Sequence, residues 1–204
     1  MNIQSFGDCY VRISGCSSQQ RIALSEVLLA SQEWQDVVPG ISSVTVTYFN
    51  GLTPPEAEDI LRAAIHACEI SAPLVTPEIS LPISYGGADG PDLERLAKQR
   101  SITEAEVIRQ HEACLYTVEM MGFTPGFAYL SGFENDWSIT RLETPAKEIP
   151  AGLVGIVGDK CGSFGLKGPG GWPIIGRADA HFFDITRDEP FLLSAGMKVR
   201  FQSV

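Results

Sequence analysis

Two segments rich in glycine, proline and aromatic residues constrain this chain more than any other feature. Residues 122–132 read Gly-Phe-Thr-Pro-Gly-Phe-Ala-Tyr-Leu-Ser-Gly, and residues 168–177 read Gly-Pro-Gly-Gly-Trp-Pro-Ile-Ile-Gly-Arg. Because glycine permits positive φ and proline fixes φ near about −65°, both segments are expected to form rigid turns. Their large rings indicate two walls of one pocket. The alternative is that the rings fill a core, which is the usual fate of large aromatic side chains.

The charge of the chain is unevenly distributed. The 204 residues are 44% hydrophobic and 20% charged, which is typical of a soluble globular protein of one or two domains. The net charge of −10 argues against binding to nucleic acid or to an anionic membrane. Residues 1–121 hold 7 Lys/Arg and 16 Asp/Glu, a net charge of −9, whereas residues 122–204 hold 8 and 9, a net charge of −1. The second part is therefore the better place for an anionic ligand.

The cysteines and the N-terminus predict a cytoplasmic protein. The five cysteines form no Cys-x-x-Cys pair and are odd in number, so reduced thiols are expected at Cys9, Cys16, Cys68, Cys114 and Cys161. No apolar run approaches the length of about 18 residues that a membrane helix needs. The N-terminus has neither the basic flank nor the apolar core of a secretory signal. The three histidines lack the spacing of metal ligands, so no structural metal is expected.

The fold class predicted for the whole chain is α+β, beginning with a small N-terminal α+β sandwich over residues 1–84. Runs of β-branched residues indicate strands, and apolar residues at helical spacing behind a capping residue indicate helices. The expected order is β-α-β-α-β. Asn50 and Gly51 are expected to end the second strand. The expected strands are 9–13, 41–49 and 79–85, and the expected helices run over about 18–34 and 54–68.

A turn cluster at residues 86–91 predicts the boundary to a second domain over residues 85–204. Two short helices are expected there, over 91–99 and 103–111, the second with a capping box from Thr103 to Glu106. Many short β runs separated by Gly/Pro turns then predict a β-barrel or a sandwich. These runs are 115–121, 152–157, 173–175, 181–185, 191–193 and 197–201.

Candidate chemistry lies close to the two Gly/Pro/aromatic segments. His111 ends a capped helix, where it could act as an acid or base near neutral pH, or could simply favour the helix C-terminus. His66 and His181 are expected to have packing or surface roles. Four cations near the turns could hold a phosphate or a carboxylate, although each could equally be a solvated surface charge. They are Lys147, Lys160, Lys167 and Arg177.

An ordered set of motifs resembles one known family. The motifs are residues 82–93, His111, residues 122–130, 150–152, 169–172, 175–177 and 188–190, and they span nearly the whole chain. In this order they are similar to the allophanate hydrolase subunit 1 family, which includes components of 5-oxoprolinase and the sporulation-kinase inhibitor KipI. The resemblance implies an α+β N-terminal domain and a cyclophilin-like β-barrel.

The resemblance also implies an activity that needs partners. It implies the B subunit of a 5-oxoprolinase, which converts 5-oxo-L-proline, ATP and water to L-glutamate, ADP and phosphate. Activity would require a homologous subunit 2/C protein, a lactam-utilising A component, and ATP with Mg²⁺ shared with the partner. Catalytic roles are expected for His111 and Lys160. Substrate or partner binding is expected at Gly122, Phe123, Pro125, Gly126, Phe127, Tyr129, Pro169, Gly170, Gly171, Trp172 and Arg177. The backbone amides of both turns are expected to stabilise developing negative charge.

Two other functions are compatible with the resemblance. A KipI-like inhibitor would bind a sensor histidine kinase through an apolar aromatic patch. Subunit 1 of a urea- or allophanate-type carboxyltransferase would work with a biotinylated partner. The chain departs from the family pattern at Lys147, where the family has an arginine-containing stretch, and at Lys160, Phe164 and Gly165. Because lysine lacks the bidentate fork of arginine, the substrate, or the activity itself, is open to differ from that of the commonest family members.

Overall fold

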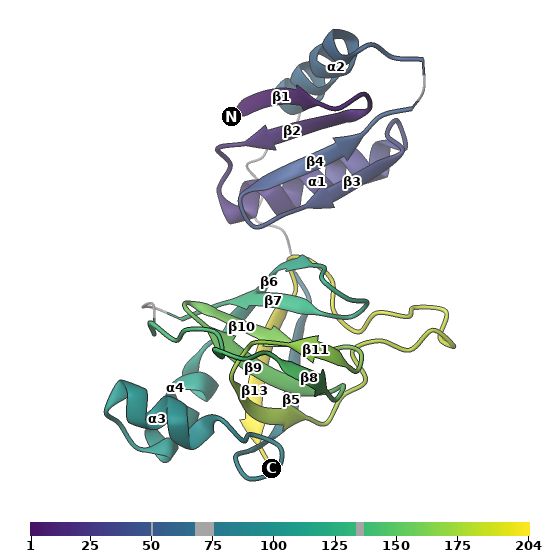
Figure 1. Ribbon diagram of the computed structural model, residues 1–204. Coiled ribbons are helices and arrows are strands. Elements are labelled where there is room, and N and C mark those ends of the chain that lie inside the picture. The colour runs from purple at the N-terminus through teal and green to yellow at the C-terminus, as the bar shows by residue number, and fades with distance from the viewer. Residues whose placement is uncertain (50, 68–75, 134–136) are drawn as a thin grey trace. The chain divides into compact units, whose positions relative to one another are not determined.

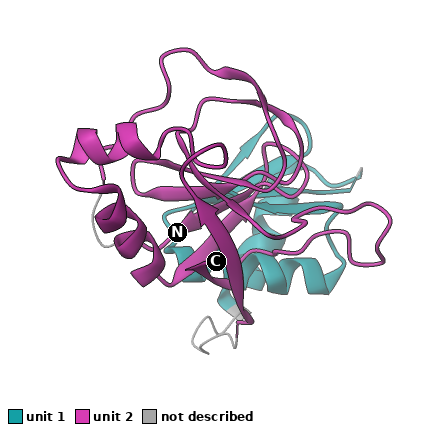
Figure 2. Cartoon of the chain, turned by 90° about the horizontal axis from the view of Figure 1, so that it is seen from below, with its two compact units in different colours: residues 1–75 teal, residues 76–204 magenta. Residues whose placement is uncertain are grey.

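A computed structural model describes residues 1–49, 51–67, 76–133 and 137–204. The chain divides into two compact units, Met1–Val75 and Thr76–Val204 (Figure 2). Each unit is described by itself. Asn50, which was expected to end a strand, and Cys68 lie outside the described residues. Among the described residues, the other four cysteines form no disulfide.

The N-terminal unit is an antiparallel sheet with two helices (Figure 1). The sheet has the strand order β1-β2-β4-β3. Two of its strands, β1 and β3, were absent from the sequence prediction. The strand expected at 41–49 is present as the shorter β4. The elements are β1 (Asn2–Phe6), β2 (Tyr10–Ser14), α1 (Ser18–Ser31), β3 (Asp36–Pro39), β4 (Ser43–Thr47) and α2 (Pro54–Ala67).

One face of this sheet is covered by both helices. Alternate residues of the central strands, such as Val11 and Val46, are fully buried. They share a core with Leu24 of α1 and Leu61 of α2. Helix α1 begins at a capping box, in which Ser17 Oγ accepts from the backbone N–H of Gln20. The predicted N-terminal α+β sandwich is therefore confirmed as a two-layer structure.

The second unit closes seven described strands into a barrel with the order β10-β7-β6-β13-β5-β12-β9 (Figure 1). A two-stranded ribbon, β8 with β11, is separate from the barrel sheet, and two helices complete the unit. The predicted β-barrel and the α+β class are confirmed. The elements are β5 (Glu78–Tyr85), α3 (Leu93–Arg100), α4 (Glu104–Ala113), β6 (Tyr116–Met121), β7 (Ala128–Ser131), β8 (Ala146–Ile149), β9 (Leu153–Val157), β10 (Lys160–Ser163), β11 (Gly168–Gly170), β12 (Ile174–Ala178) and β13 (Lys198–Ser203).

Strand β5 corrects the predicted domain boundary between residues 84 and 85. The strand is present as expected, but it pairs in parallel with β13 and antiparallel with β12. The units therefore divide at residues 75 and 76. The reason is physical: an alternating strand such as β5 fits any half-buried sheet position, and its pattern does not reveal which strand it pairs with.

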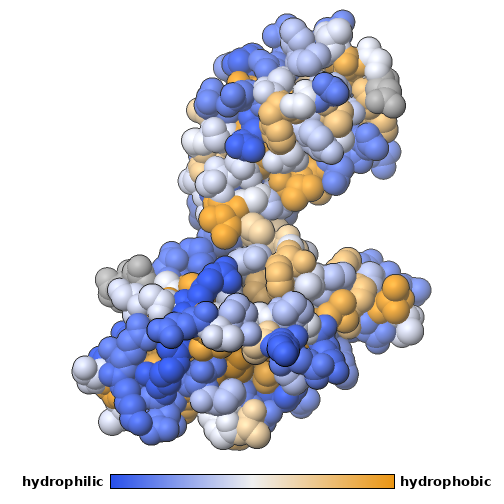
Figure 3. All heavy atoms as spheres, in the orientation of Figure 1, coloured by the Kyte–Doolittle hydropathy of each residue, from blue (hydrophilic) through white to orange (hydrophobic). Residues whose placement is uncertain are grey.

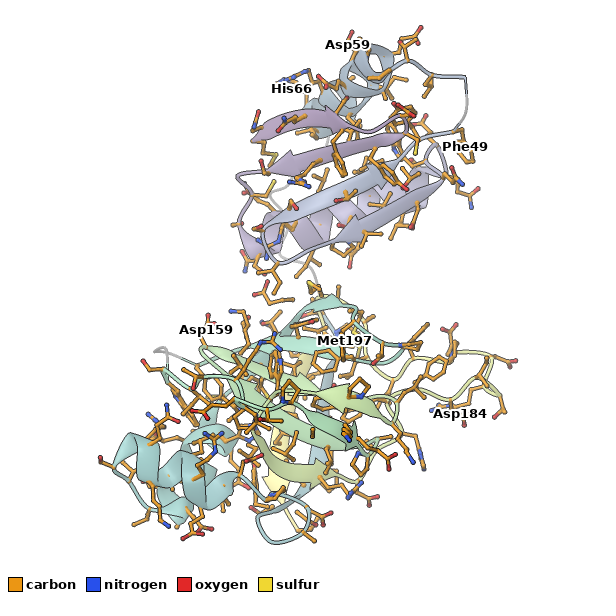
Figure 4. All side chains as sticks on the ribbon, in the orientation of Figure 1. Phe49, Asp59, His66, Asp159, Asp184 and Met197 are labelled. Atoms are coloured by element: carbon orange, nitrogen blue, oxygen red, sulfur yellow. The ribbon has the colours of Figure 1, made fainter. Side chains whose placement is uncertain are left out.

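The segment after β12 is another correction. Residues 181–185 and 191–193 were expected to be strands, but they form a loop held by a single bridge between Phe183 and Phe191. Asp184 marks this loop, which extends away from the barrel wall (Figure 4). The two Phe rings pack against each other at a tilt of 41°, with 5.2 Å between their centroids, so the aromatic residues that suggested strands instead contact each other.

Strand β9 is buried on both sides, and this positions the site. Val154 and Ile156 point into the barrel core. Leu153 belongs to a second, smaller cluster that includes Ile149 of the ribbon and the ring of Trp172. Because alternate residues of a strand point to opposite faces, this second cluster lies on the outer face of the barrel wall.

Candidate functional site

The two Gly/Pro/aromatic segments meet at one pocket of about 340 Å³ on the barrel unit. The first segment contributes three aromatic side chains and the second contributes the Pro-Gly-Gly-Trp stretch. The lining residues are Phe123, Phe127, Tyr129, Arg141, Pro145, Phe164, Pro169, Gly170, Gly171 and Trp172. The predicted convergence of the segments is therefore present in the structure.

The inner wall of the pocket is a cluster of rings packed edge to face. The centroids of Phe127 and Trp172 lie 5.8 Å apart, and those of Tyr129 and Trp172 lie 5.9 Å apart. Phe127 also contacts Phe164 at 5.0 Å between centroids. Such tilted arrangements are the favoured geometry of aromatic pairs. Both expectations made for the rings are thus met, because they fill a small core and also present an apolar surface.

A glycine on β10 makes room for these rings. A Cβ atom at Gly162 would lie 2.8 Å from Cζ of Phe127 and 2.9 Å from Cζ3 of Trp172. Any larger residue would push the two rings off the strand. The sequence analysis did not assign Gly162 a role, since a glycine inside a strand pattern has many possible reasons.

The loop between β6 and β7 holds a strained aromatic residue at the pocket rim. Phe123 has a φ of 74° and its side chain is 62% exposed. A non-glycine residue in this region costs on the order of 1–3 kcal/mol. Two hydrogen bonds hold the loop: the N–H of Gly122 donates to the Phe127 carbonyl at 3.1 Å, and the N–H of Phe127 donates to the Thr124 carbonyl at 3.0 Å. The Gly122 amide is therefore engaged within the loop and does not face a ligand.

Arg141 supplies the charge of the pocket. Among the described residues that line it, Arg141 is the only charged one. Its guanidinium carbon lies 5.8 Å from the centroid of the Trp172 ring, which is within the range of a cation–π contact. The N–H of the next residue, Leu142, donates to the Gly171 carbonyl at 2.8 Å and ties this stretch to the second segment. Arg141 was not predicted from the sequence, because it stands outside every motif. The one sequence feature that could have indicated Arg141 is its position just before the Thr-Pro at residues 144–145.

His111 does not lie in the pocket, and its predicted role as an acid or base does not fit its position. The side chain is fully buried in the barrel core. Its Nδ1 lies 2.7 Å from the hydroxyl of Tyr85, and its Nε2 lies 3.5 Å from Sγ of Cys161. Burial lowers the pKa of His111 to about 3, so the ring is neutral at physiological pH. Burial also raises the pKa of the Cys161 thiol, so the pair is uncharged.

Lys160 and Arg177, the two cations predicted to be site residues, form local ion pairs and do not line the pocket. Lys160 Nζ donates to Asp159 at 2.6 Å, at the turn where Figure 4 labels Asp159. Arg177 Nε donates to Asp89 at 2.6 Å, and its Nη1 donates to the Ala151 carbonyl at 2.8 Å. Arg177 thereby links the turn at residues 86–91 to the barrel, which is a structural role.

Three further residues proposed for binding, Gly122, Pro125 and Gly126, belong to the β6–β7 loop but are not among the described residues lining the pocket. Gly126 has a φ of 76°, and a Cβ there would lie 2.6 Å from Cβ of Phe183. Glycine is thus required at this position by backbone conformation and by close packing. These residues shape the loop that carries Phe123.

The comparison with known proteins places this chain in a defined family. Residues 2–193 match the family described as carboxyltransferase domain, subdomain C and D, and the chain belongs to that family. It is 38% identical over 191 residues to the B subunit of 5-oxoprolinase from Escherichia coli O157:H7, covering 91% of this chain and 85% of that protein. It is 34% identical over 181 residues to the B subunit of 5-oxoprolinase from Bacillus subtilis (strain 168), covering 81% and 74%. The resemblance found in the motifs is confirmed.

Solved structures share the same fold. The protein TTHA0988 superimposes with a TM-score of 0.82 at 27% identity, over 96% of this chain but only 40% of that one. PH0987 from Pyrococcus horikoshii gives a TM-score of 0.61 at 32% identity, over 100% and 97%. The urea amidolyase of Kluyveromyces lactis gives 0.79 at 18% identity over 15% of its chain, a likeness of fold alone. This chain thus spans less than half of TTHA0988.

A search of the described residues for membrane segments found no helix long and apolar enough to cross a bilayer. Within the same residues, no group of three or more His, Cys, Asp or Glu side chains is arranged to hold a metal ion.

Proposed function

We propose that this chain is the B subunit of an ATP-dependent 5-oxoprolinase and is active only together with a homologous subunit 2/C protein and a lactam-utilising A component. The relatives, which are named as the B subunit of 5-oxoprolinase, support the class of enzyme. The observation that carries the proposal is the placement of one cation, Arg141, beside the ring of Trp172 at an apolar pocket.

The substrate fits the chemistry of this pocket. 5-Oxo-L-proline is a small five-membered lactam ring with one carboxylate. The pocket volume of about 340 Å³ lies in the usual range of ligand sites, roughly 300–1,000 Å³. Trp172 and Tyr129 offer apolar ring surface to the lactam, and the guanidinium of Arg141 offers a bidentate partner to the carboxylate. The chain would thereby hold the substrate in a fixed orientation.

The reaction needs activation of the lactam. An unactivated lactam carbon is a poor electrophile, so in the proposed sequence the lactam oxygen attacks the γ-phosphorus of ATP and ADP leaves. One water then adds to the ring carbon, and the ring C–N bond breaks as the nitrogen takes up a proton, which leaves an acyl phosphate. A second water displaces phosphate from this acyl phosphate and gives L-glutamate. The described residues lining the pocket include no carboxylate that could bind Mg²⁺. ATP and its Mg²⁺ are therefore substrates that this chain binds together with the partner protein.

Reconstitution tests the proposal. The chain is mixed with the purified A and C components, ATP and 5-oxo-L-proline, and L-glutamate is measured. With Arg141→Gln, the KM for 5-oxo-L-proline should rise about 10-fold or more, which corresponds to about 1.4 kcal/mol. The matched control is Arg187→Gln, which removes the same charge from the exposed loop after β12. Full glutamate production without this chain would refute the proposal.

A pull-down separates the other two functions. Recovery of a subunit 2/C homologue from cell extract supports the oxoprolinase. Recovery of a sensor histidine kinase, with no glutamate produced in the assay above, would favour the KipI-like inhibitor instead. A biotinylated partner, detected with avidin, would favour the carboxyltransferase.

A further inference from the structure

A second pocket, of about 510 Å³, lies on the barrel unit beside α3 and α4. It shares no lining residue with the aromatic pocket. The surface over these two helices is largely hydrophilic (Figure 3). Two arginines stand in the lining, which consists of Arg100, Arg109, Gln110, Ala113, Cys114, Leu115, Gly132 and Trp137.

Arg100 is held in one orientation at this pocket. Its guanidinium carbon lies 3.9 Å from the centroid of the Trp137 ring, and its Nη1 donates to Oε1 of Gln110 at 2.8 Å. The side chain is half-buried, and burial lowers the pKa of Arg100 below its ordinary value. Among the described residues, no carboxylate oxygen lies within the 4.0 Å of an ion pair with this side chain. Arg100 is thus a partly desolvated cation with unused N–H donors.

Glu106 is a described carboxylate that attracts Arg100, but its hydrogen bonds go to other residues. Glu106 accepts two hydrogen bonds from Arg109, at 2.8 and 2.6 Å, and one from Nε2 of Gln110. These bonds lower the pKa of Glu106 to about 2, so its carboxylate is ionised and matched to Arg109. Because Gln110 donates to Glu106, its carbonyl oxygen faces Arg100. The Glu106–Gln110 pair therefore orients Arg100 without neutralising it.

We infer that this second pocket binds a small oxyanion, a carboxylate or a phosphate, with Arg100 as the main donor. A planar guanidinium backed by an aromatic ring presents its N–H edge to the paired oxygens that both groups carry. A half-buried cation that has no ion-pair contact with a described carboxylate gains more from such an anion than a fully solvated one does, because less water screens the contact. The site is separate from the aromatic pocket and does not depend on the function proposed for it.

Binding of two probes tests this inference. Inorganic phosphate and acetate are titrated separately into the full chain by isothermal titration calorimetry at low salt. At least one of them should saturate a single site, and the one that does identifies a phosphate or a carboxylate site. Arg100→Gln should weaken that binding about 10-fold or more. The matched control is Arg95→Gln, which removes an exposed arginine of the same helix that pairs with Asp92 at 3.6 Å.

Two further variants keep the test decisive. Arg100→Lys keeps the charge but loses the planar fork, so it should bind the probe more weakly than the unmodified chain even if Arg100→Gln fails to fold. Arg187→Gln, on the exposed loop after β12, should leave this binding unchanged. Equal affinity in the unmodified chain and in Arg100→Lys would overturn the inference, as would the absence of any saturable binding of both probes.

Discussion

Two aromatic clusters of the barrel unit, one outside its wall and one inside, differ in their exposure and in their polar contacts. The outer cluster surrounds Trp172 and opens into a pocket with Arg141 at its edge. The inner cluster surrounds His111, whose ring lies 4.9 Å from Phe201 and 5.2 Å from Tyr116 between centroids. In the outer cluster Phe123 is 62% exposed and Tyr129 is half-buried, and a cation lies nearby. The inner histidine has no accessible face, because it is fully buried and both of its ring nitrogens contact other side chains.

This difference explains why residue type alone misplaces a site. A histidine inside a motif suggests acid–base chemistry, but His111 contributes to the packing of the core. An arginine outside every motif suggests a solvated surface charge, but Arg141 lines the pocket. Accessibility and unused hydrogen-bonding capacity separate the two cases, and both depend on the tertiary structure.

The largest expected effect is on the inner cluster. His111→Ala removes a fully buried ring and leaves the hydroxyl of Tyr85 without its partner. It should lower the free energy of unfolding by about 3–5 kcal/mol. Urea unfolding followed by circular dichroism measures the loss. His181→Ala, at an exposed position, is the control and should change stability by less than about 0.5 kcal/mol. A destabilisation equal to that of the control would show that the inner cluster does not support the barrel.

The second effect is a pH dependence that arises from the same residue. The pKa of His111 is about 3 in the folded protein and 6.5, the ordinary value, in the unfolded chain. Between these values the unfolded chain binds a proton that the folded protein does not. The stability contribution of neutral His111 is therefore complete above about pH 6.5 and is lost as the pH falls towards 3, with a slope of up to about 1.4 kcal/mol per pH unit.

The variant His111→Gln checks this assignment. Glutamine is polar and does not titrate, so the part of the acid sensitivity that arises at His111 should disappear. Urea midpoints measured from pH 7 to pH 4 for both proteins provide the comparison. Identical pH profiles would assign the acid sensitivity to other groups.

A third, intermediate effect is expected at the wall between the clusters. Gly162→Ala places a methyl group against the rings of Phe127 and Trp172, so it should cost about 1–3 kcal/mol and alter the pocket. Gly168→Ala is the matched control, because a Cβ there meets nothing within 4 Å. Tryptophan fluorescence and urea unfolding report both changes. If the two alanine variants are equally stable, the close packing at β10 has no energetic role.

The smallest effect on stability is expected at the pocket rim. Asparagine tolerates positive φ better than phenylalanine, so Phe123→Asn should relieve strain while losing a largely exposed ring. The free energy of unfolding should change by less than about 1 kcal/mol. Binding in the outer pocket, measured as the KM for 5-oxo-L-proline in the reconstituted enzyme, should weaken all the same. Unchanged KM would exclude Phe123 from the site.

Local sequence patterns predicted the local structure and the position of the pocket. The helix start at Thr103 follows from its capping residue, whose side chain accepts the expected backbone hydrogen bond from Glu106. The convergence of residues 122–132 and 168–177 follows from their shared composition. Helix caps depend on residues that are neighbours in the sequence, and the convergence depends on two segments of similar composition. Both can be recognised in a single sequence.

Long-range pairing was beyond the reach of the sequence. The partner of β5, the glycine at position 162 and the contact of Arg141 with Trp172 each depend on residues far away in the chain. The same limit applies to His111, whose contact with Cys161, fifty residues later, is not visible in the sequence. Patterns of single residues do not specify such contacts, because many partners satisfy the same pattern.

The position of β13 in the barrel has a consequence for the order of folding during synthesis. Residues 198–203 lie between β5 and β6 and pair with both, so the sheet stays open until they have been made. The strands and helices of the N-terminal unit, by contrast, all lie within the first 75 residues. On the ribosome, this unit can fold early while the β5 and β6 edges of the barrel wait unpaired, which is the interval in which a sheet is most exposed to wrong partners.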